Sequence, residues 1–288
     1  MYFSILISVH NKEEPLHLLN ALDSVAMNTC SPSEIVLVWD GSPAKALEEV
    51  ANSFCSVLPI RTITIIKSNG LGPALAAGLE QCSNEWIARF DSDDICSPDR
   101  FEKQLKYISD NPDVDAFSAT LVEFTRTPED NDLRRKCVPL HHDEIVRYAR
   151  WRNPLNHPAA MFRRSVALKA GSYRNEPSFE DYSLWLRMIQ AGARLGNMKY
   201  PVVFARSGKA MQSRRGGIRY ALREISFLRN MRSSGILHRR DFYASILLKT
   251  PLRLLPASMR HLLYNAALRK LSATRLTIKT NSSPRGAQ

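Results

Sequence analysis

The chain lacks the features that mark membrane-spanning, disulfide-rich or zinc-structured proteins. No apolar run in its 288 residues approaches the roughly 18 residues of a membrane-spanning helix. The five cysteines are odd in number and scattered, and no Cys-x-x-Cys occurs. This usage predicts reduced, mostly buried thiols in a cytosolic protein and disfavours a zinc site. The composition is otherwise that of a soluble globular protein, with 44% hydrophobic and 24% charged residues.

Two nucleotide-binding signatures are also absent. No Gly-Lys-Ser/Thr follows the Gly-rich stretch Asn69-Gly70-Leu71-Gly72, which excludes a Walker loop. The first apolar run does not lead into Gly-x-Gly-x-x-Gly, which argues against a dinucleotide dehydrogenase. The Gly-rich stretch itself either cradles an anion or only turns the chain. Residues 1–9 lack the positively charged N-terminal region and the small-residue cleavage site of a signal peptide, so we expect a first strand there and not a signal peptide.

Acidic residues are scarce in the last part of the chain. From Arg206 onward there are 18 Lys and Arg against two acids, whereas residues 1–205 hold 22 bases and 26 acids. The net charge of +12 therefore sits at the C-terminal end, and such a region suits lipid headgroups or nucleic acid. Aromatic residues for base stacking are sparse there, so no nucleic acid is expected. Leucines alternate with the basic residues, which favours amphipathic helices on an anionic membrane surface; the alternative is a helical cap on the preceding domain.

Strand-like and helix-like patterns alternate over the first 110 residues. The strands are apolar throughout and need cover on both faces. The pattern therefore predicts an α/β fold with a mostly parallel sheet flanked by helices, Rossmann-like in its nucleotide-binding half. Expected strands are 3–9, 34–39, 60–67 and 85–90, and expected helices are 15–27, 43–54, 73–82 and one that Ser97 caps and that ends near residue 109.

The pattern weakens in the second half of the chain. We expect a loop over 125–136, a short helix over 141–151, a strand over 158–162, a helix over 178–191 and a strand over 198–206. From Arg219 the chain reads as basic helices that Pro251 and Pro256 break. The expected organisation is a main domain over 1–217, a basic amphipathic helical region over 218–272 and a disordered tail over 273–288.

Polar clusters follow the four expected strands. Ligands of open α/β sheets bind beyond the carboxyl ends of the strands, so these clusters should face one crevice. Asp91 and Asp93 would repel each other there unless a cation sat between them, and Mg²⁺ or Mn²⁺ prefers such oxygen ligands. The alternative is a solvated loop that caps the next helix. Asp40, after the second strand, either accepts hydrogen bonds from a nucleoside or belongs to a common turn.

Three further motifs carry candidate chemistry. The acids Glu180 and Asp181 begin a helix. They either supply a general base or only interact favourably with the positive end of the helix dipole. His157 lies in a rigid turn between two prolines, where a structural histidine is favoured over a catalytic one. Arg214 and Arg215 stand beside glycines and either clamp a departing diphosphate or form a solvated basic loop.

Taken together, these stretches resemble the family 2 glycosyltransferases, the inverting class with the GT-A fold. The resemblance covers roughly residues 3–217, which would be the catalytic domain, and the later motifs look like the bacterial exopolysaccharide and lipopolysaccharide branch. One departure is Trp39, where many members carry an acid. The matching stretches are Ser8 to Glu13, Glu34 to Ser42, Asn69 to Gly72, Asp91 to Asp94, Asn153 to Pro158 and Glu180 to Leu186.

The resemblance implies a role for each site residue. Asp181 would be the base, Asp93 and Asp91 would bind Mn²⁺ or Mg²⁺, and Asp91 would also face ribose. The other donor-binding residues would be Glu13, Asp40, Asn69, Arg214 and Arg215, and candidates for the acceptor side are Asn156, His157 and Glu180.

The resemblance also implies substrates and a location. The donor would be a nucleotide-sugar, UDP-linked first and GDP- or dTDP-linked as alternatives, and the acceptor a lipid-linked glycan in surface polysaccharide synthesis. The enzyme would be cytoplasmic and peripheral at the inner face of the plasma membrane. A sugar nucleotidyltransferase is the rival enzyme class. Such an enzyme would be expected to have a basic, Gly-rich loop after the first strand, and this chain has none there. A degenerate, non-catalytic transferase domain with a nucleic-acid-binding tail ranks lower.

Overall fold

A nine-stranded sheet runs through the molecule in the order β3-β2-β1-β4-β8-β6-β9-β5, with β7 paired to β6. The structure is a computed structural model that describes residues 1–129, 133–207, 216–255 and 259. Strands β1 to β4 are parallel to one another, β8 is antiparallel to both β4 and β6, and β6 is parallel to β9. The strands are β1 (Phe3–His10), β2 (Glu34–Asp40), β3 (Ile60–Ile65), β4 (Trp86–Asp91), β5 (Ile95–Cys96), β6 (Ala116–Phe124), β7 (Arg134–Lys136), β8 (Met161–Arg163) and β9 (Leu195–Arg206).

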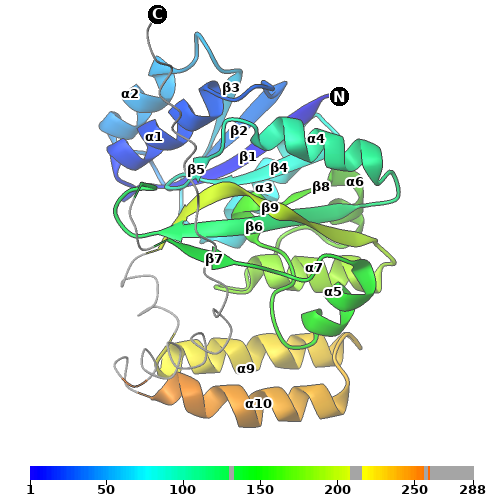
Figure 1. Ribbon diagram of the computed structural model, residues 1–288. Coiled ribbons are helices and arrows are strands. Elements are labelled where there is room, and N and C mark those ends of the chain that lie inside the picture. Colours follow the sequence, from blue (N-terminus) through cyan, green and yellow to red (C-terminus); the bar gives the residue numbers. More distant parts are fainter. Residues whose placement is uncertain (130–132, 208–215, 256–258, 260–288) are drawn as a thin grey trace, which may run out of the picture.

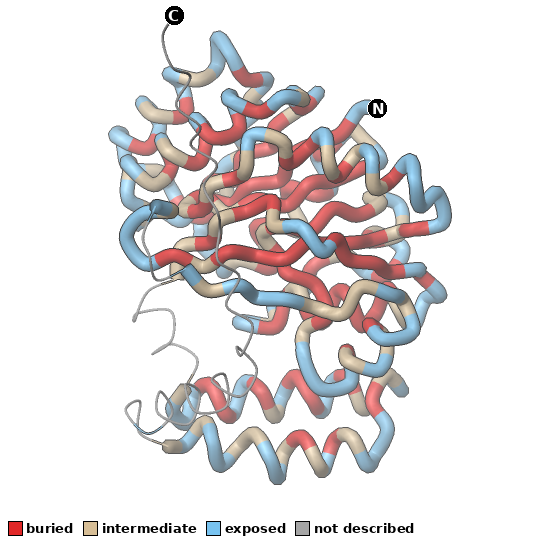
Figure 2. Tube along the Cα trace, in the orientation of Figure 1, coloured by how far each residue is buried: buried red, intermediate tan, exposed pale blue. Residues whose placement is uncertain are grey.

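Helices cover both faces of this sheet (Figure 1). Side chains alternate between the faces of a strand, so Ile5 and Ile7 of β1 pack toward α1, α2 and α4, whereas Leu6 packs toward α3, α6 and α7. Figure 2 shows the buried residues gathered in the strands between these layers. The helices are α1 (Pro15–Ala26), α2 (Lys45–Ser53), α3 (Leu71–Gln81), α4 (Arg100–Asp110), α5 (His142–Ala149), η1 (His157–Ala159), α6 (Arg164–Lys169), α7 (Glu180–Gln190), α9 (Ile218–Ser233) and α10 (Arg239–Leu254).

The predicted α/β architecture is confirmed, and several local expectations are wrong. Residues 134–136 are not loop but strand β7, which pairs with the far end of β6. The strand expected over 158–162 is a 3-10 turn followed by β8, which is antiparallel. Ser97 does not cap α4, because its hydroxyl donates to Asp99 Oδ1 at 2.8 Å. Helix α10 continues through Pro251 to Leu254 and ends two residues before Pro256.

The last two helices, α9 and α10, form a separate layer beneath α7 (Figure 1). Phe227 of α9 stacks on Phe179 with ring centroids 4.7 Å apart, and Tyr182 of α7 packs against the same ring. Glu224 of α9 accepts two hydrogen bonds from Arg253 of α10. The part of the chain that is described contains no helix long and apolar enough to cross a membrane. The boundaries at 217 and 272 stay predictions, and the tail over 273–288 lies outside the described residues.

Candidate active site

Loops far apart in the sequence line one crevice at the carboxyl ends of β1, β2 and β4. The register places Ser8 opposite Asp91 and His10 opposite Asp40. All four lie on the face of the sheet that α3 covers, because side chains alternate along a strand. The crevice has a volume of about 270 Å³ and is lined by Ser8, His10, Glu13, Asp40, Ser68, Gly70, Leu71, Asp91, Ser92 and Asp93. The structure therefore brings the predicted polar clusters together.

Glu13 and Asp40 stand on the β1 and β2 side of the crevice. Glu13 accepts a hydrogen bond from Ser92 Oγ at 3.0 Å and contacts His17 Nδ1 at 3.2 Å, which fixes its carboxylate. Asp40 is 3% exposed, and its Oδ1 has no hydrogen-bond partner within the described chain. A buried carboxylate oxygen that faces a crevice is a ready acceptor for an N–H or O–H group of a ligand. Trp39 packs into the core on the opposite face of β2.

Asp91 and Asp93 stand on the β4 side. Burial raises the pKa of Asp93 to about 6, and the charges of Asp91 and Glu13 act in the same direction. A divalent cation would relieve this crowding, and the oxygen-only donor set suits Mg²⁺ or Mn²⁺. Among the residues described, no three His, Cys, Asp or Glu side chains are grouped so as to hold a metal ion. An ion at these two carboxylates would therefore need further ligands, such as phosphate oxygens.

Asp94 has a different environment from its two neighbours. It is 3% exposed, and its Oδ1 accepts the backbone N–H of Arg206 at 2.8 Å. Arg206 Nε in turn donates to the carbonyl of Asp93 at 3.2 Å. Asp94 thus ties the end of β9 to the acidic loop, and it positions Asp93 through the backbone.

Sequence analysis missed Arg89, which is fully buried on β4. It lies two residues before Asp91, hence on the same face, and its Nη2 donates to Asp91 Oδ1. Its Nε and Nη1 have no hydrogen-bond partner among the residues described. A buried guanidinium is costly unless an opposite charge compensates it, and Asp91 supplies that charge to Arg89. The signal was available, because an arginine breaks the apolar alternation of β4 on the crevice face.

His157 of η1 and Tyr173, which follows α6, form a second polar group that packs against α7. His157 Nε2 and Tyr173 OH are 3.0 Å apart, and the His157 ring packs edge-on to Trp185. Burial lowers the pKa of His157 well below its usual value, and the charge of Arg89 adds to this effect. His157 is therefore a neutral, buried hydrogen-bonding residue.

The acidic pair Glu180 and Asp181 begins α7. Asp181 accepts a hydrogen bond from Asn153 Nδ2 at 2.6 Å on Oδ2 and from the backbone N–H of Tyr182 at 2.8 Å on Oδ1. Burial raises the pKa of Glu180 to about 7, and the neighbouring charge of Asp181 adds to the shift. The pair therefore combines one oriented carboxylate with one that is easily protonated.

This acidic pair lies close to the crevice. Burial raises the pKa of Tyr173, and the charges of Asp181, Glu180 and Asp91 act in the same direction, so all three lie within electrostatic range of one phenol. Gly72, next to the crevice residue Leu71, lies against Glu180, since a Cβ placed on Gly72 would lie 3.3 Å from Glu180 Cβ. The start of α7 therefore borders the side of the crevice formed by Asp91 and α3.

The remaining predicted site residues are placed differently. Asn156 is fully buried, and its Nδ2 donates to the carbonyls of Ala119 at 2.9 Å and Lys136 at 3.1 Å. Its amide holds two backbone segments together, an arrangement that does not favour contact with an acceptor. Asn69 lies between two residues that line the crevice. Arg214 and Arg215 lie outside the described residues.

The fold and the crevice define a GT-A-type α/β protein whose carboxylates meet where parallel strands end. The sequence profile described as "Glycosyl transferase family 2" matches residues 4–171. The chain belongs to this family and is a glycosyltransferase of its bacterial polysaccharide branch. It is 37% identical over 265 residues to the "Amylovoran biosynthesis glycosyltransferase AmsE" of Erwinia amylovora, covering 91% of this chain and 97% of that one. It is 36% identical over 268 residues to the "UDP-Gal:alpha-D-GlcNAc-diphosphoundecaprenol beta-1,3-galactosyltransferase" of Escherichia coli, covering 93% and 97%.

Solved structures show the same fold. The mannosyltransferase PcManGT from Pyrobaculum calidifontis, in complex with GDP-Man and Mn²⁺, superposes with a TM-score of 0.63 at 17% identity, covering 94% of this chain and 81% of that one. Residues 1–349 of S. aureus TarS, in complex with UDP-GlcNAc, superpose with a TM-score of 0.61 at 16% identity, covering 79% and 66%. The expected GT-A fold is therefore confirmed.

Proposed function

We propose that the enzyme transfers a sugar from a nucleoside-diphosphate-sugar, UDP-linked in the first instance, to a hydroxyl of a lipid-linked glycan with inversion at the anomeric carbon. The observation that carries this proposal is the convergence of Asp40, Asp91 and Asp93 in one crevice beside the acidic start of α7. A relative of nearly the same length is named for a UDP-sugar donor and a diphosphoundecaprenol acceptor. GDP- and dTDP-sugars are the alternative donors.

Each side of the crevice takes one part of the donor. The unpartnered Oδ1 of Asp40 accepts from the base, with Glu13 and Asn69 beside it. Asp91, held by Arg89, faces the ribose, and Asp93 faces the diphosphate. Mg²⁺ or Mn²⁺, when bound by Asp93 and Asp91, would supply positive charge to the diphosphate oxygens. Arg214 and Arg215 are predicted to add to this charge.

Asp181 acts as the general base in this proposal. Its hydrogen bonds from Asn153 and the Tyr182 backbone fix the orientation of the carboxylate. Asp181 takes the proton of the acceptor hydroxyl as the hydroxyl oxygen bonds to the anomeric carbon. The bond from that carbon to the diphosphate breaks on the opposite face, and the nucleoside diphosphate leaves with the electron pair. Attack from the face opposite the leaving group inverts the configuration.

The acceptor side extends to the membrane in this proposal. Large apolar side chains are exposed on α9 and α10, and basic residues Arg219, Arg223, Arg239 and Arg240 are exposed on the same two helices. We call the apolar set the leucine surface: Ile218, Leu222, Tyr243, Leu247, Leu248, Leu252 and Leu254, each between 49% and 73% exposed. Apolar residues beside cations suit an anionic bilayer. This supports a cytoplasmic enzyme bound peripherally at the inner face of the plasma membrane.

The test compares donor binding with transfer. Nucleotide-sugars are screened by thermal shift with and without Mn²⁺, and transfer of the best donor to a GlcNAc-diphospholipid is then measured. We expect Asp181→Asn to lower kcat by about 10²- to 10⁴-fold, the usual worth of a general base, with unchanged donor affinity. Asp23→Asn, an exposed acid on α1, serves as the control. Undiminished kcat in Asp181→Asn would refute the base, and no stabilisation by any nucleotide-sugar would refute the donor class.

A further inference from the structure

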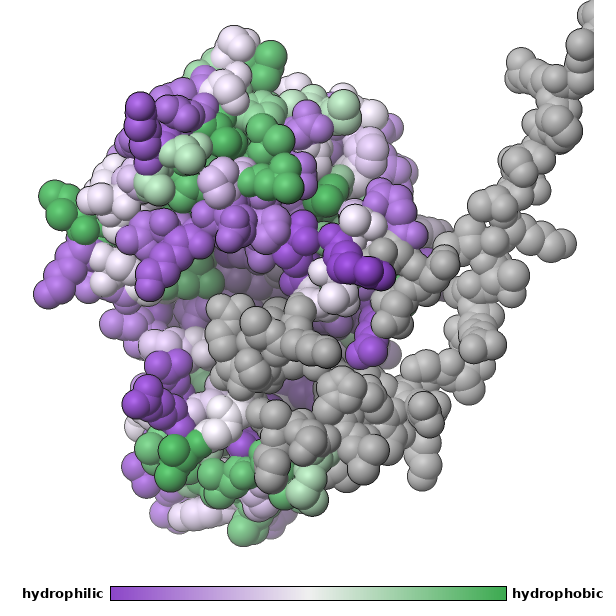
Figure 3. All heavy atoms as spheres, turned by 90° about the vertical axis from the view of Figure 1, so that its left-hand side faces the viewer, coloured by the Kyte–Doolittle hydropathy of each residue, from purple (hydrophilic) through white to green (hydrophobic). Residues whose placement is uncertain are grey.

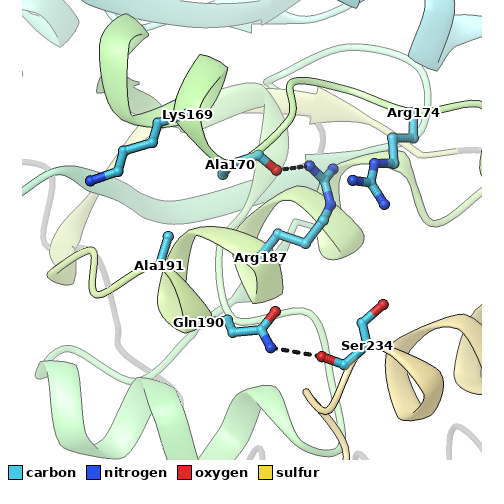
Figure 4. A pocket seen from close by; sticks show the side chains of 7 residues that line it. All are labelled: Lys169, Ala170, Arg174, Arg187, Gln190, Ala191 and Ser234. Atoms are coloured by element: carbon cyan, nitrogen blue, oxygen red, sulfur yellow. Dashed lines mark hydrogen bonds between the residues drawn. The ribbon is translucent and has the colours of Figure 1, made fainter.

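A second cavity lies between the ends of α6 and α7 and the turn that joins α9 to α10 (Figure 4). Its volume is about 260 Å³, and it shares no lining residue with the crevice. The lining residues are Lys169, Ala170, Arg174, Arg187, Gln190, Ala191 and Ser234. Three of these are cations and none is an acid, so the cavity is strongly basic.

Arg187 is the fixed element of this cavity. It is only 7% exposed, and its guanidinium donates to the carbonyl of Ala170, to the carbonyl of Ser172 at 2.7 Å and to Ser183 Oγ at 3.3 Å. These bonds engage three of the five N–H groups of an arginine, so two remain. The group is therefore a buried, preoriented donor at the cavity wall.

Arg174 brings a second guanidinium to the first. The chain reverses sharply after α6, with positive φ at Gly171 (+84°) and Ser172 (+53°), and this reversal returns Arg174 toward α7. A Cβ on Gly171 would lie 3.1 Å from Arg174 Nη2 and 3.4 Å from Arg187 Nη1. In Figure 4 the two guanidinium groups lie next to each other. The bare glycine thus makes room for two adjacent cations.

The cations at this cavity outnumber the nearby acids, of which Glu176 acts on Arg187. Within the described chain, neither the Lys169 nor the Arg174 side chain makes a hydrogen bond or an ion pair. Burial and the charge of Arg174 together lower the pKa of Arg187 to about 10, and the charge of Glu176 opposes them. The C-terminal ends of α6 and α7 favour a cation here, and Arg187 already donates to the carbonyls of Ala170 and Ser172 just after α6. Among the described residues, the side chains of Lys169 and Arg174 have no such partner.

We infer that this cavity binds an oxyanion of the phosphate class between Arg174 and Arg187, with Lys169 as a third cation. Two guanidinium forks match the oxygens of a phosphate or diphosphate through charge-assisted hydrogen bonds. Such an anion would also remove the repulsion between the two arginines. Free phosphate, pyrophosphate and a phospholipid headgroup offer the same chemistry. Because Gln190 Nε2 bonds the carbonyl of Ser234 at 2.7 Å, the anion would sit where the main domain meets the α9–α10 turn.

Calorimetric titration of the full-length protein with pyrophosphate tests this site. EDTA keeps divalent cations from drawing the diphosphate into the crevice, and constant ionic strength removes screening differences. We expect saturable binding that weakens at least tenfold in Arg174→Ala with Lys169→Ala. Both residues are exposed, so the variant should fold. Arg229→Ala, an exposed arginine on α9, and Asp93→Asn in the crevice should bind as the parent does.

The competing results are separable. No saturable binding, equal affinity in the double variant, or loss of binding in Asp93→Asn would each overturn the proposal. Vesicles that contain phosphatidylglycerol then identify the source. If they displace pyrophosphate while phosphatidylcholine vesicles do not, the site takes a lipid headgroup; if neither does, it takes a soluble phosphate.

Discussion

Arg89 connects the packing of the sheet to the chemistry of the crevice. It donates to Asp91 from a fully buried position, so its loss would leave that carboxylate without its partner. We expect Arg89→Met to fold and to weaken Mn²⁺-dependent nucleotide binding about tenfold or more, because hydrogen bonds to charged groups contribute about 1.5–3 kcal/mol. Arg89→Lys should recover part of the loss. Calorimetric titration with UDP and Mn²⁺ measures both.

A matched variant separates this role from stability. Arg100 is as deeply buried, but it donates to the carbonyl of Arg89 and to Gln104, and within the described chain it donates no hydrogen bond to a crevice carboxylate. Arg100→Met should therefore lower the free energy of unfolding while the folded protein keeps its nucleotide affinity. Equal losses of affinity in the Arg89 and Arg100 variants would show that Arg89 acts only through the fold.

Glu180 makes stability depend on pH. Its pKa is raised from 4.5 to about 7 in the folded state, chiefly by burial. Between these values the folded state keeps a proton that the unfolded state has lost, so stability falls as pH rises through this window. Glu180→Gln removes the titration, and the parent should therefore lose up to about 3 kcal/mol relative to it between pH 5 and 8. Urea unfolding at both pH values measures this, with Glu144→Gln on α5 as an exposed control; a pH-independent difference would contradict it.

At the scale of elements, the sequence predicted β1 to β4 because apolar residues recur along each strand and polar residues follow it. The expectation that every strand is apolar throughout is wrong for the edge strand β3, in which Arg61, Thr62 and Thr64 interrupt the isoleucines. The same logic located Asp40 and Asp93, since strand ends converge in a parallel sheet. It failed for β7, a short basic strand that exists only because β6 offers an edge. It also missed Arg89, although its partner Asp91 lies only two residues further along β4. Tyr173 was missed because its partner His157 lies in a separate turn. Patterns along the chain find strand ends but not long-range pairs.

Close packing at Gly72 joins α3 to the start of α7. A Cβ there would lie 2.1 Å from the carbonyl oxygen of Arg174, a contact that forces backbone to move. We expect Gly72→Ala to cost about 1–3 kcal/mol of stability, as overpacking does, and to lower kcat because Glu180 is displaced. Urea unfolding and transfer rates measure the two effects. Glu80→Ala, exposed near the end of α3, should change neither; wild-type kcat in Gly72→Ala would show that α7 tolerates the shift.

At the scale of the whole molecule, the crevice and the leucine surface are oriented together. Strands β1, β2 and β4 end on the side of the molecule where α9 begins and α10 ends (Figure 1). Figure 3 looks onto that side and shows hydrophilic residues across its middle and hydrophobic residues gathered at its lower part, over α9 and α10. The proposed bilayer contact with the lower part would bring a lipid-linked sugar to the side of the molecule on which these strands end. The arrangement thus gives the basic helices a use beyond covering α7.

This orientation predicts that a variant with weakened membrane binding also loses transfer to a membrane-bound lipid acceptor, but keeps transfer to a water-soluble acceptor. Leu247 and Leu248 are 73% and 64% exposed on α10, so replacing both with Glu should not disturb the core. The added charges oppose anionic lipid, and we expect at least tenfold weaker co-sedimentation with phosphatidylglycerol vesicles. Transfer to a membrane-bound acceptor should fall accordingly, whereas transfer to a short-chain, water-soluble analogue should persist. Val57→Glu, 65% exposed between α2 and β3, should leave both unchanged. Unaltered vesicle binding in the leucine variant would refute the membrane-binding role of the leucine surface. It would leave the assignment of the crevice as the donor site unaffected.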